Sequence, residues 1–242
     1  MGMASSRSEA SYLAELHDAV ITPLGWIRNA SNQTLLVTLD DDEERLAVYK
    51  PDAGERPLHD FPYGTLARRE VAAFVLSDWL GWDLVPATIY RDGPEGPGSL
   101  QRYVPHAPAR HYFVLAEEGT HDAALTRLAL FDLLVNNADR KASHVMLGEE
   151  GLRGCDHGLC FHREPKVRTV IWDFAGMPIA PSDRVDLQRL AERLGDAAGP
   201  ELASLLEETE IVALRERASE LARLDCLPDP PQDRRPYPWP LL

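Results

Sequence analysis

Residues 130–147 read LFDLLVNNADRKASHVML and place a polar stretch directly after a strongly apolar one. The apolar part completes HDAALTRLALFDLLV at 121–135, which we expect to form a helix that is buried on most sides. Residues 136–144 then need partners for their polar groups, because unpaired polar groups beside a core cost free energy. This stretch predicts a functional loop at the end of a buried helix.

The spacing of three side chains around this loop indicates phosphoryl-transfer chemistry. His144 follows Asp139 by five residues and Asp156 follows it by 17, at the end of another apolar stretch. In kinase sites one aspartate orients or deprotonates the acceptor hydroxyl. A ligand five residues later holds one Mg²⁺, and a second aspartate bridges the metal to the phosphates. Each aspartate alone is explained better as a turn-capping residue, so the spacing needs further support.

Two upstream residues supply that support. Lys50 ends the predicted strand LAVYKP, where a kinase lysine contacts the α and β phosphates of ATP. Glu70 lies 20 residues further on, inside the next predicted helix, where it can pair with that lysine. Each residue alone also has a purely structural explanation. Lys50 is then a solvated lysine at a strand end, and Glu70 is a glutamate on the surface of a helix. Four elements in this order, on the right kinds of secondary structure, favour a kinase-like ATP site.

Lysine is rare in this chain: of 25 basic residues only Lys50, Lys141 and Lys166 are lysine. An ammonium group is a point charge on a flexible stem, unlike the planar guanidinium of arginine. Lys141 follows Asp139 by two residues, so one interpretation is that it neutralises charge on the transferring phosphoryl group. The other is that Lys141 and Arg140 form a solvent-facing basic pair. The sequence leaves both open.

The order of predicted elements gives an α+β class with two lobes. Strand-like runs around tight turns fill residues 21–104, which form a β-rich N-lobe that also holds the Glu70 helix. Residues 105–227 are mostly helical by periodicity and form a C-lobe with the catalytic and metal-binding loops. Residues 1–20 are expected to form an arm or a short helix.

Residues 228–242 are expected to form an extended tail. Six of the thirteen residues at 228–240 are proline, a composition that is incompatible with a regular helix or a central strand. The tail docks either on the protein's own surface or on a partner, and the sequence does not choose between them.

Composition excludes several classes of partner. The formal net charge is −14 and the pI is about 5.0, which disfavours nucleic acid and anionic membranes, since both attract basic surfaces. No apolar run approaches the ~18 residues of a spanning helix, so we expect no stable membrane association. The three cysteines have no metal-ligand spacing and their number is odd, which favours reduced thiols and a cytoplasmic location.

With these motifs the chain resembles the phosphatidylinositol 3-/4-kinase-like branch of the kinase superfamily. It is most similar to type II phosphatidylinositol 4-kinases, more distantly to HipA-type kinases, and to a group of actinobacterial proteins placed in that branch. The resemblance implies a two-lobed, protein-kinase-like fold. The matching stretches are VYKP at 48–51, REVAAFVLSDWLGWDLVPATIY at 69–90, LFDLLVNNADRKASHVML at 130–147 and GCDHGLCFH at 154–162.

The resemblance also assigns roles to the four motif residues. Lys50 matches the ATP-contacting lysine, and Glu70 is its ion-pair partner. Asp139 matches the catalytic aspartate and Asp156 the metal-binding aspartate.

Two further segments complete the ATP site that the resemblance implies. Ser31 and Asn32 lie in the turn that covers the phosphates. Gln101, Tyr103 and Val104 belong to the hinge, whose backbone bonds to adenine.

The chain departs from the family pattern in three places. His144 stands where the family usually has a metal-binding asparagine, and hard Mg²⁺ prefers oxygen ligands, so Mn²⁺ use or a weakened second metal site is expected. His157 stands where most kinases have phenylalanine. The turn NASNQ at 29–33 lacks the full glycine pattern.

Three functions follow from these observations. The first is ATP- and divalent-metal-dependent transfer of the γ-phosphate to a hydroxyl of a protein or a small molecule, with a lipid headgroup disfavoured by the acidic charge. The second is a pseudokinase that binds nucleotide and regulates a partner. The third is nucleotidyl transfer on the same fold.

Overall fold

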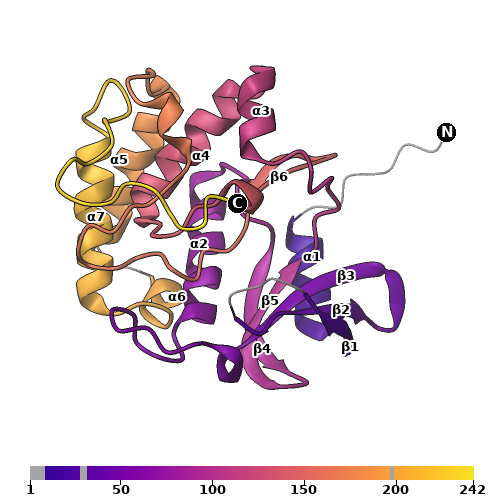
Figure 1. Ribbon diagram of the computed structural model, residues 1–242. Coiled ribbons are helices and arrows are strands. Elements are labelled where there is room, and N and C mark those ends of the chain that lie inside the picture. Colours follow the sequence, from indigo (N-terminus) through magenta and orange to yellow (C-terminus); the bar gives the residue numbers. More distant parts are fainter. Residues whose placement is uncertain (1–8, 28–31, 197–198) are drawn as a thin grey trace.

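The strands expected in residues 21–104 form one antiparallel sheet in the computed structural model, which describes residues 9–27, 32–196 and 199–242. Their order in space is β1-β2-β3-β5-β4 (Figure 1). Helix α2, Leu66–Leu80, connects β3 to β4 and packs on β4 and β5. The strand bounds are Ile21–Trp26 for β1, Leu35–Leu39 for β2, Asp42–Pro51 for β3, Thr88–Gly93 for β4 and Gly96–Arg102 for β5.

A glycine opposite the end of β3 allows the strand pairing that positions Lys50. Lys50 pairs with Ser99 of β5, and Pro51 pairs with Gly98. A Cβ atom on Gly98 would lie 2.3 Å from the Lys50 carbonyl oxygen. Because any side chain there would push the two strands apart, Gly98 is required for this close approach.

Helix α2 begins after Thr65, as the sequence predicts, but a different residue satisfies its first N–H groups. The Thr65 hydroxyl donates to the Pro62 carbonyl at 2.7 Å and forms no cap bond. The Glu55 carboxylate accepts hydrogen bonds from the N–H groups of Leu66 at 2.8 Å and Ala67 at 3.2 Å. The capping group therefore comes from the preceding loop, where a carboxylate also faces the positive end of the helix dipole.

In the described residues the C-lobe contains five helices and a two-stranded hairpin. Helix α3 is not predicted by the sequence. Near the end of the mostly helical region, α6 and α7 are separate helices, because Glu207 and Glu210 form a capping box that starts a new helix. The bounds are Tyr112–Glu118 for α3, Asp122–Val135 for α4, Val145–Gly148 for β6, Gly151–Gly154 for β7, Pro181–Asp196 for α5, Pro200–Ala203 for α6 and Glu208–Leu221 for α7.

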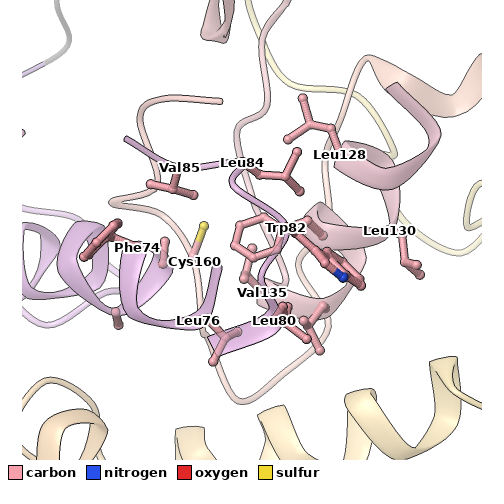
Figure 2. Packing of buried hydrophobic residues seen from close by; sticks show 14 of the residues in the cluster. Phe74, Leu76, Leu80, Trp82, Leu84, Val85, Leu128, Leu130, Val135 and Cys160 are labelled. Carbon is pink, nitrogen blue, oxygen red and sulfur yellow. The ribbon is translucent and has the colours of Figure 1, made fainter. Parts of the chain in front are cut away.

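One hydrophobic core runs through both lobes. Figure 2 shows the part where α2, the segment that follows it and α4 pack together. The Ser77 hydroxyl of α2 fixes that segment by accepting the N–H groups of Leu84 at 2.8 Å and Val85 at 3.2 Å. A shared core ties the Lys50 strand to the loops of the C-lobe. The labelled side chains are Phe74, Leu76, Leu80, Trp82, Leu84, Val85, Leu128, Leu130, Val135 and Cys160.

The two ends of the described chain lie against the rest of the protein. Helix α1, Glu9–Asp18, packs on β4 and β5, and Arg91 of β4 donates to the carbonyl groups of Leu16 and His17, both at 2.8 Å. The tail at 228–242 contains no helix or strand, as its composition predicts, and crosses the C-lobe toward the junction of the lobes (Figure 1). None of the described helices is both long and apolar enough to cross a membrane.

Candidate active site

Two asparagines start the loop after α4, and their side chains explain why polar residues follow a buried helix. Asn136 ends the helix in the left-handed region at φ 57°, a conformation that asparagine tolerates better than most residues. Its amide donates to the carbonyl groups of His162 and Glu164, both at 2.7 Å. Asn137 accepts the backbone N–H of Asp139 at 2.9 Å. The two side chains thus fix the backbone that carries the predicted base.

Asp139 and Lys141 form an ion pair, with 2.8 Å between Lys141 Nζ and Asp139 Oδ2. Their side chains are 23% and 11% exposed, so the pair is reachable from solvent on the aspartate side. Burial raises the pKa of Asp139 above its ordinary value, against the opposing effect of Lys141. A raised pKa makes this carboxylate a better proton acceptor than a fully exposed aspartate.

Arg140 points the opposite way, into the core, so the interpretation of a solvent-facing basic pair is wrong for this residue. Arg140 and Asp132 of α4 are both 0% exposed, and Arg140 Nη2 lies 2.9 Å from Asp132 Oδ1. Arg140 Nη1 also donates to the Cys155 carbonyl at 2.7 Å. Thr169 donates to the same Asp132 carboxylate at 3.3 Å. Arg140 thereby joins α4, the catalytic loop and the segment that carries Asp156.

His157 is part of this buried network rather than of the nucleotide surface. Its Nε2 lies 2.7 Å from Arg140 Nη2. Because a guanidinium only donates, Nε2 accepts and the imidazole carries its proton on Nδ1. Burial and the neighbouring Arg140 charge hold the pKa of His157 well below its ordinary value.

Lys50, Glu70 and Asp156 meet where the lobes join. Lys50 Nζ contacts Glu70 Oε1 and lies 2.9 Å from Asp156 Oδ1. Burial of the ammonium lowers its pKa, but attraction to Asp156 and Glu70 outweighs that effect and raises the pKa of Lys50 above its ordinary range. Glu70 is only 3% exposed and also accepts the backbone N–H of His157 at 2.9 Å. The strand, the helix and the C-lobe loop thus converge on one ammonium group.

Asp156 adopts a backbone conformation that few residues other than glycine use, with φ 59°. The adjacent N–H of Cys155 donates to the His144 carbonyl at 3.0 Å and helps to hold this geometry. The Asp156 side chain remains 43% exposed. Burial would raise its pKa, but Lys50 and His144 outweigh burial and hold the pKa of Asp156 well below its ordinary value. The carboxylate is therefore charged and accessible, as a metal ligand must be.

His144 lies beside Asp156 with a defined tautomer. Its Nδ1 accepts the backbone N–H of Lys141 at 3.4 Å, so the proton of the neutral ring is on Nε2. Nε2 lies 3.3 Å from Asp156 Oδ2. Burial lowers the pKa of His144 to about 4, so the ring is neutral at pH 7. The protonated Nε2 of His144 therefore lies on the side of the ring that is near the Asp156 carboxylate.

The residues that the resemblance assigns to adenine lie at the end of β5. Gln101 is buried, and its amide donates to the Thr88 hydroxyl at 2.8 Å. The N–H of Tyr103 donates to the Leu46 carbonyl at 3.1 Å, so this N–H is already used within the N-lobe. Val104 contacts the β6–β7 hairpin, since a Cβ on Gly148 would lie 2.8 Å from Val104 Cγ1. Of the three residues, Val104 is thus the one that contacts the C-lobe hairpin.

The turn assigned to the phosphates is described only in part. Ser31 lies outside the described residues. The Asn32 amide oxygen accepts the backbone N–H of Arg56 at 3.0 Å, so this side chain connects the turn to the loop after β3.

Sequence reasoning missed two residues that support the site, Asp132 and Asn137. Both are 0% exposed, and Asn137 donates to the Asp132 carboxylate at 3.0 Å. The signal that could have found Asp132 is its charge in the middle of the apolar helix sequence LALFDLLV, because a buried charge requires a partner.

Comparison with known proteins places the chain in a family. No protein-family model matches it. Protein Rv2133c of Mycobacterium tuberculosis is 41% identical over an alignment of 262 positions, gaps included, which covers 94% of each chain. The chain belongs to the family of Protein Rv2133c. Because the match covers 94% of both proteins, the family extends over both lobes.

Solved structures show the type of fold. The crystal structure of the Golgi casein kinase matches 91% of this chain and 74% of that chain, with a TM-score of 0.56 and 14% identity. A crystal structure of the same kinase with Mn/ADP bound matches 88% of this chain and 74% of that chain, with a TM-score of 0.55 and 14% identity. The α+β, two-lobed, kinase-like fold predicted from the sequence is confirmed.

Proposed function

We propose that this protein is an ATP- and divalent-metal-dependent phosphotransferase of the atypical kinase type, which transfers the γ-phosphate to a hydroxyl. One observation carries the proposal: Lys50 of the N-lobe lies 2.9 Å from Asp156 of the C-lobe and also contacts Glu70. Three residues far apart in sequence, on a strand, a helix and a loop, meet in the arrangement that phosphoryl transfer needs. The predicted base, Asp139, lies on the neighbouring loop.

The residues present fit a divalent metal that is held jointly with the nucleotide. The charged, accessible Asp156 carboxylate supplies hard oxygen ligands, and no group of three His, Cys, Asp or Glu side chains in the described part of the chain forms a metal cluster. With ATP bound, its phosphate oxygens would supply further ligands of the same hard type. A bound Mg²⁺ or Mn²⁺ supplies neutralisation of phosphate charge. The Mn/ADP complex of the Golgi casein kinase supports this choice of cofactor.

The protein's own residues then bind the nucleotide, accept the proton and neutralise charge. Lys50, held by Glu70, binds the α and β phosphates. Asp139 orients the acceptor hydroxyl and takes its proton, a role that its raised pKa favours. Lys141, which contacts Asp139 at 2.8 Å, neutralises charge on the transferring group. The turn of Asn32, to which Ser31 belongs in sequence, is assigned to the phosphates. The segment at 101–104 is assigned to adenine through the backbone groups that its sheet pairing leaves free, which excludes the Tyr103 N–H.

The proposed acceptor class follows from the net charge, and the proposed cellular location follows from the state of the cysteines. The net charge of −14 disfavours an anionic membrane or nucleic acid as the acceptor, which leaves a protein or a small molecule. Cys155, Cys160 and Cys226 are free thiols, in line with a cytoplasmic protein. Within the kinase superfamily, the motifs support placement in the phosphatidylinositol 3-/4-kinase-like branch, without its lipid substrate.

Transfer of label from ATP tests the proposal directly. We expect label from γ-labelled ATP, and none from α-labelled ATP, on an acceptor such as dephosphorylated casein in the presence of Mg²⁺ or Mn²⁺. Lys50→Met should lower the rate at least about 100-fold, because a charge-stabilising cation is lost. Lys166→Met is the matched control: Lys166 is paired with Asp60 at 3.0 Å and is 20% exposed, against 22% for Lys50, so its loss should change the rate less than about twofold. Label from the α-phosphate alone would identify nucleotidyl transfer instead.

A pseudokinase is the second candidate, and His144 is the observation that favours it. With its proton on Nε2, the imidazole offers no lone pair to a metal at the nitrogen that lies 3.3 Å from Asp156 Oδ2. Metal binding by His144 requires the other tautomer, which loses the bond from the Lys141 N–H. ATP binding without label transfer from either position would establish this alternative.

His144→Asn separates the two candidates. The pKa of about 4 makes His144 neutral at pH 7, so asparagine changes the available ligand atom without changing charge. If His144 limits the second metal position, we expect the ratio of Mg²⁺- to Mn²⁺-supported rates to rise about tenfold, because an amide oxygen suits Mg²⁺ better than nitrogen. An unchanged ratio would show that His144 only orients Asp156.

A further inference from the structure

The tail at 228–242 is bound to two segments of the C-lobe, the loop that carries Asp139 and the segment at 169–172. The Pro236 carbonyl accepts the backbone N–H of Thr169 at 3.0 Å and the indole N–H of Trp172 at 2.8 Å. Further along, the Leu241 carbonyl accepts the backbone N–H of Ala142 at 2.8 Å. Figure 1 shows the tail running from α7 across the C-lobe to the junction of the lobes.

These contact points lie beside the predicted base. Ala142 belongs to the catalytic loop, three residues after Asp139 and two before His144. Thr169 forms a parallel bridge with Arg140 of the same loop. The N–H groups of Ala142 and Thr169 therefore form one strip along the loop that carries Asp139, and the tail covers this strip.

The tail binds mainly through its main chain. Both anchors are carbonyl groups, and Trp239 is 76% exposed, Leu242 58% and Tyr237 43%, whereas Pro238 is buried. An extended proline-rich segment presents its carbonyl groups outward without internal hydrogen bonds, which is how such segments bind to grooves. Any extended polypeptide with a free carbonyl at the right spacing can replace it. A small metabolite or a lipid headgroup has no comparable row of acceptors.

The tail also lacks the group that the reaction would modify. Residues 228–242 contain no serine or threonine, and Tyr237 carries the only side-chain hydroxyl. The tail therefore brings no serine or threonine hydroxyl to the loop that carries Asp139.

From these contacts we propose that the strip formed by Ala142 N–H, Thr169 N–H and Trp172 Nε1 binds an extended segment of a protein acceptor, and that residues 236–241 occupy it as an internal competitor. The proposal rests on the proposed phosphotransferase function and narrows its acceptor class to polypeptide. Apparent acceptor affinity is then reduced by the fraction of molecules in which the tail is bound.

Binding of a separate tail peptide to a shortened chain tests the strip without any catalytic turnover. A chain ending at Asp233 lacks both anchors, and a fluorescent peptide of residues 234–242 is titrated onto it and onto the intact chain. We expect saturable binding to the shortened chain and at least about tenfold weaker binding to the intact chain, whose strip is already occupied. Equal binding to both chains, or none to a shortened chain that unfolds cooperatively, would overturn the proposal.

Kinetics test the competition, using a milder variant that ends at Pro238 and so retains the Pro236 anchor. With dephosphorylated casein as acceptor, losing one backbone hydrogen bond should raise kcat/KM about fivefold, while hydrolysis of ATP by water and the KM for ATP stay unchanged. The 234–242 peptide should inhibit this variant competitively with casein and not with ATP. An equal rise in hydrolysis by water would mean that the tail only shields the site, and the proposal would fail. If the peptide binds but no variant transfers phosphate, the strip is supported as a polypeptide-binding site and the phosphotransferase function is contradicted.

Discussion

Asp139→Asn should lower kcat by about 10²–10⁴-fold, because that is the usual contribution of a positioned general base. The substitution removes the proton acceptor but keeps the shape of the side chain and the backbone bond from Asp139 N–H to Asn137 at 2.9 Å. The dissociation constant of ATP should change less than about threefold, since binding depends on Lys50 and the metal rather than on the base. Rates of γ-label transfer and equilibrium nucleotide binding measure the two quantities separately.

A matched control distinguishes a lost base from a broken ion pair. Asp60 and Lys166 lie 3.0 Å apart and are 19% and 20% exposed, which resembles the Asp139–Lys141 pair in distance and burial. Asp60→Asn breaks a similar pair elsewhere, so it should leave kcat within about twofold of the unmodified protein. Equal losses in the two variants would show that Asp139 acts through local structure and not as a base.

Asp156→Asn should impair both turnover and nucleotide binding. Loss of the charged carboxylate removes the ligand that connects the metal to the phosphates, so metal-dependent nucleotide binding should be lost together with turnover. If Asp139→Asn and Asp156→Asn impair ATP binding equally, the division of roles between the two aspartates is wrong.

The general plan of the site could be predicted because it depends on local order along the chain. Lys50 on a strand, Glu70 on the next helix and two aspartates on successive loops are each visible in the sequence, and the structure brings Lys50, Glu70 and Asp156 together. The kinase-like fold follows from the same order of elements. These features can be predicted because each is set by periodicity and turn chemistry over a few residues.

Features set by long-range packing could not be predicted. The Glu55 carboxylate caps α2 from the preceding loop, and no local cap rule considers a residue so far upstream. The direction in which the Arg140 side chain points depends on its ion pair with Asp132, which lies one helix turn before the loop. The path of the tail depends on which N–H groups are left free on the C-lobe surface, a property of the assembled fold alone.

The second large effect is on stability, and it follows from the burial of Arg140. Asp132→Asn should lower the free energy of unfolding by about 3–5 kcal/mol, because it leaves the fully buried guanidinium without its carboxylate partner. Arg140 would retain its bonds to the carbonyl groups of Cys155 and His144 and its contact with His157, but none of these carries a compensating charge. Urea unfolding followed by fluorescence measures the change.

A second Arg–Asp pair provides the control. Arg127 donates to Asp183 through two nitrogens at 2.8 and 3.1 Å, but its side chain is 39% exposed, so water can solvate what remains when the pair is broken. Asp183→Asn, which leaves the exposed Arg127 unpaired, should therefore cost only about 1 kcal/mol. The double variant Asp132→Leu with Arg140→Met should cost less than the sum of its single changes, because no unpaired charge stays buried. A loss below about 1 kcal/mol for Asp132→Asn would mean that Arg140 reaches water when its partner is removed. In that case the catalytic loop would not depend on this ion pair for its position.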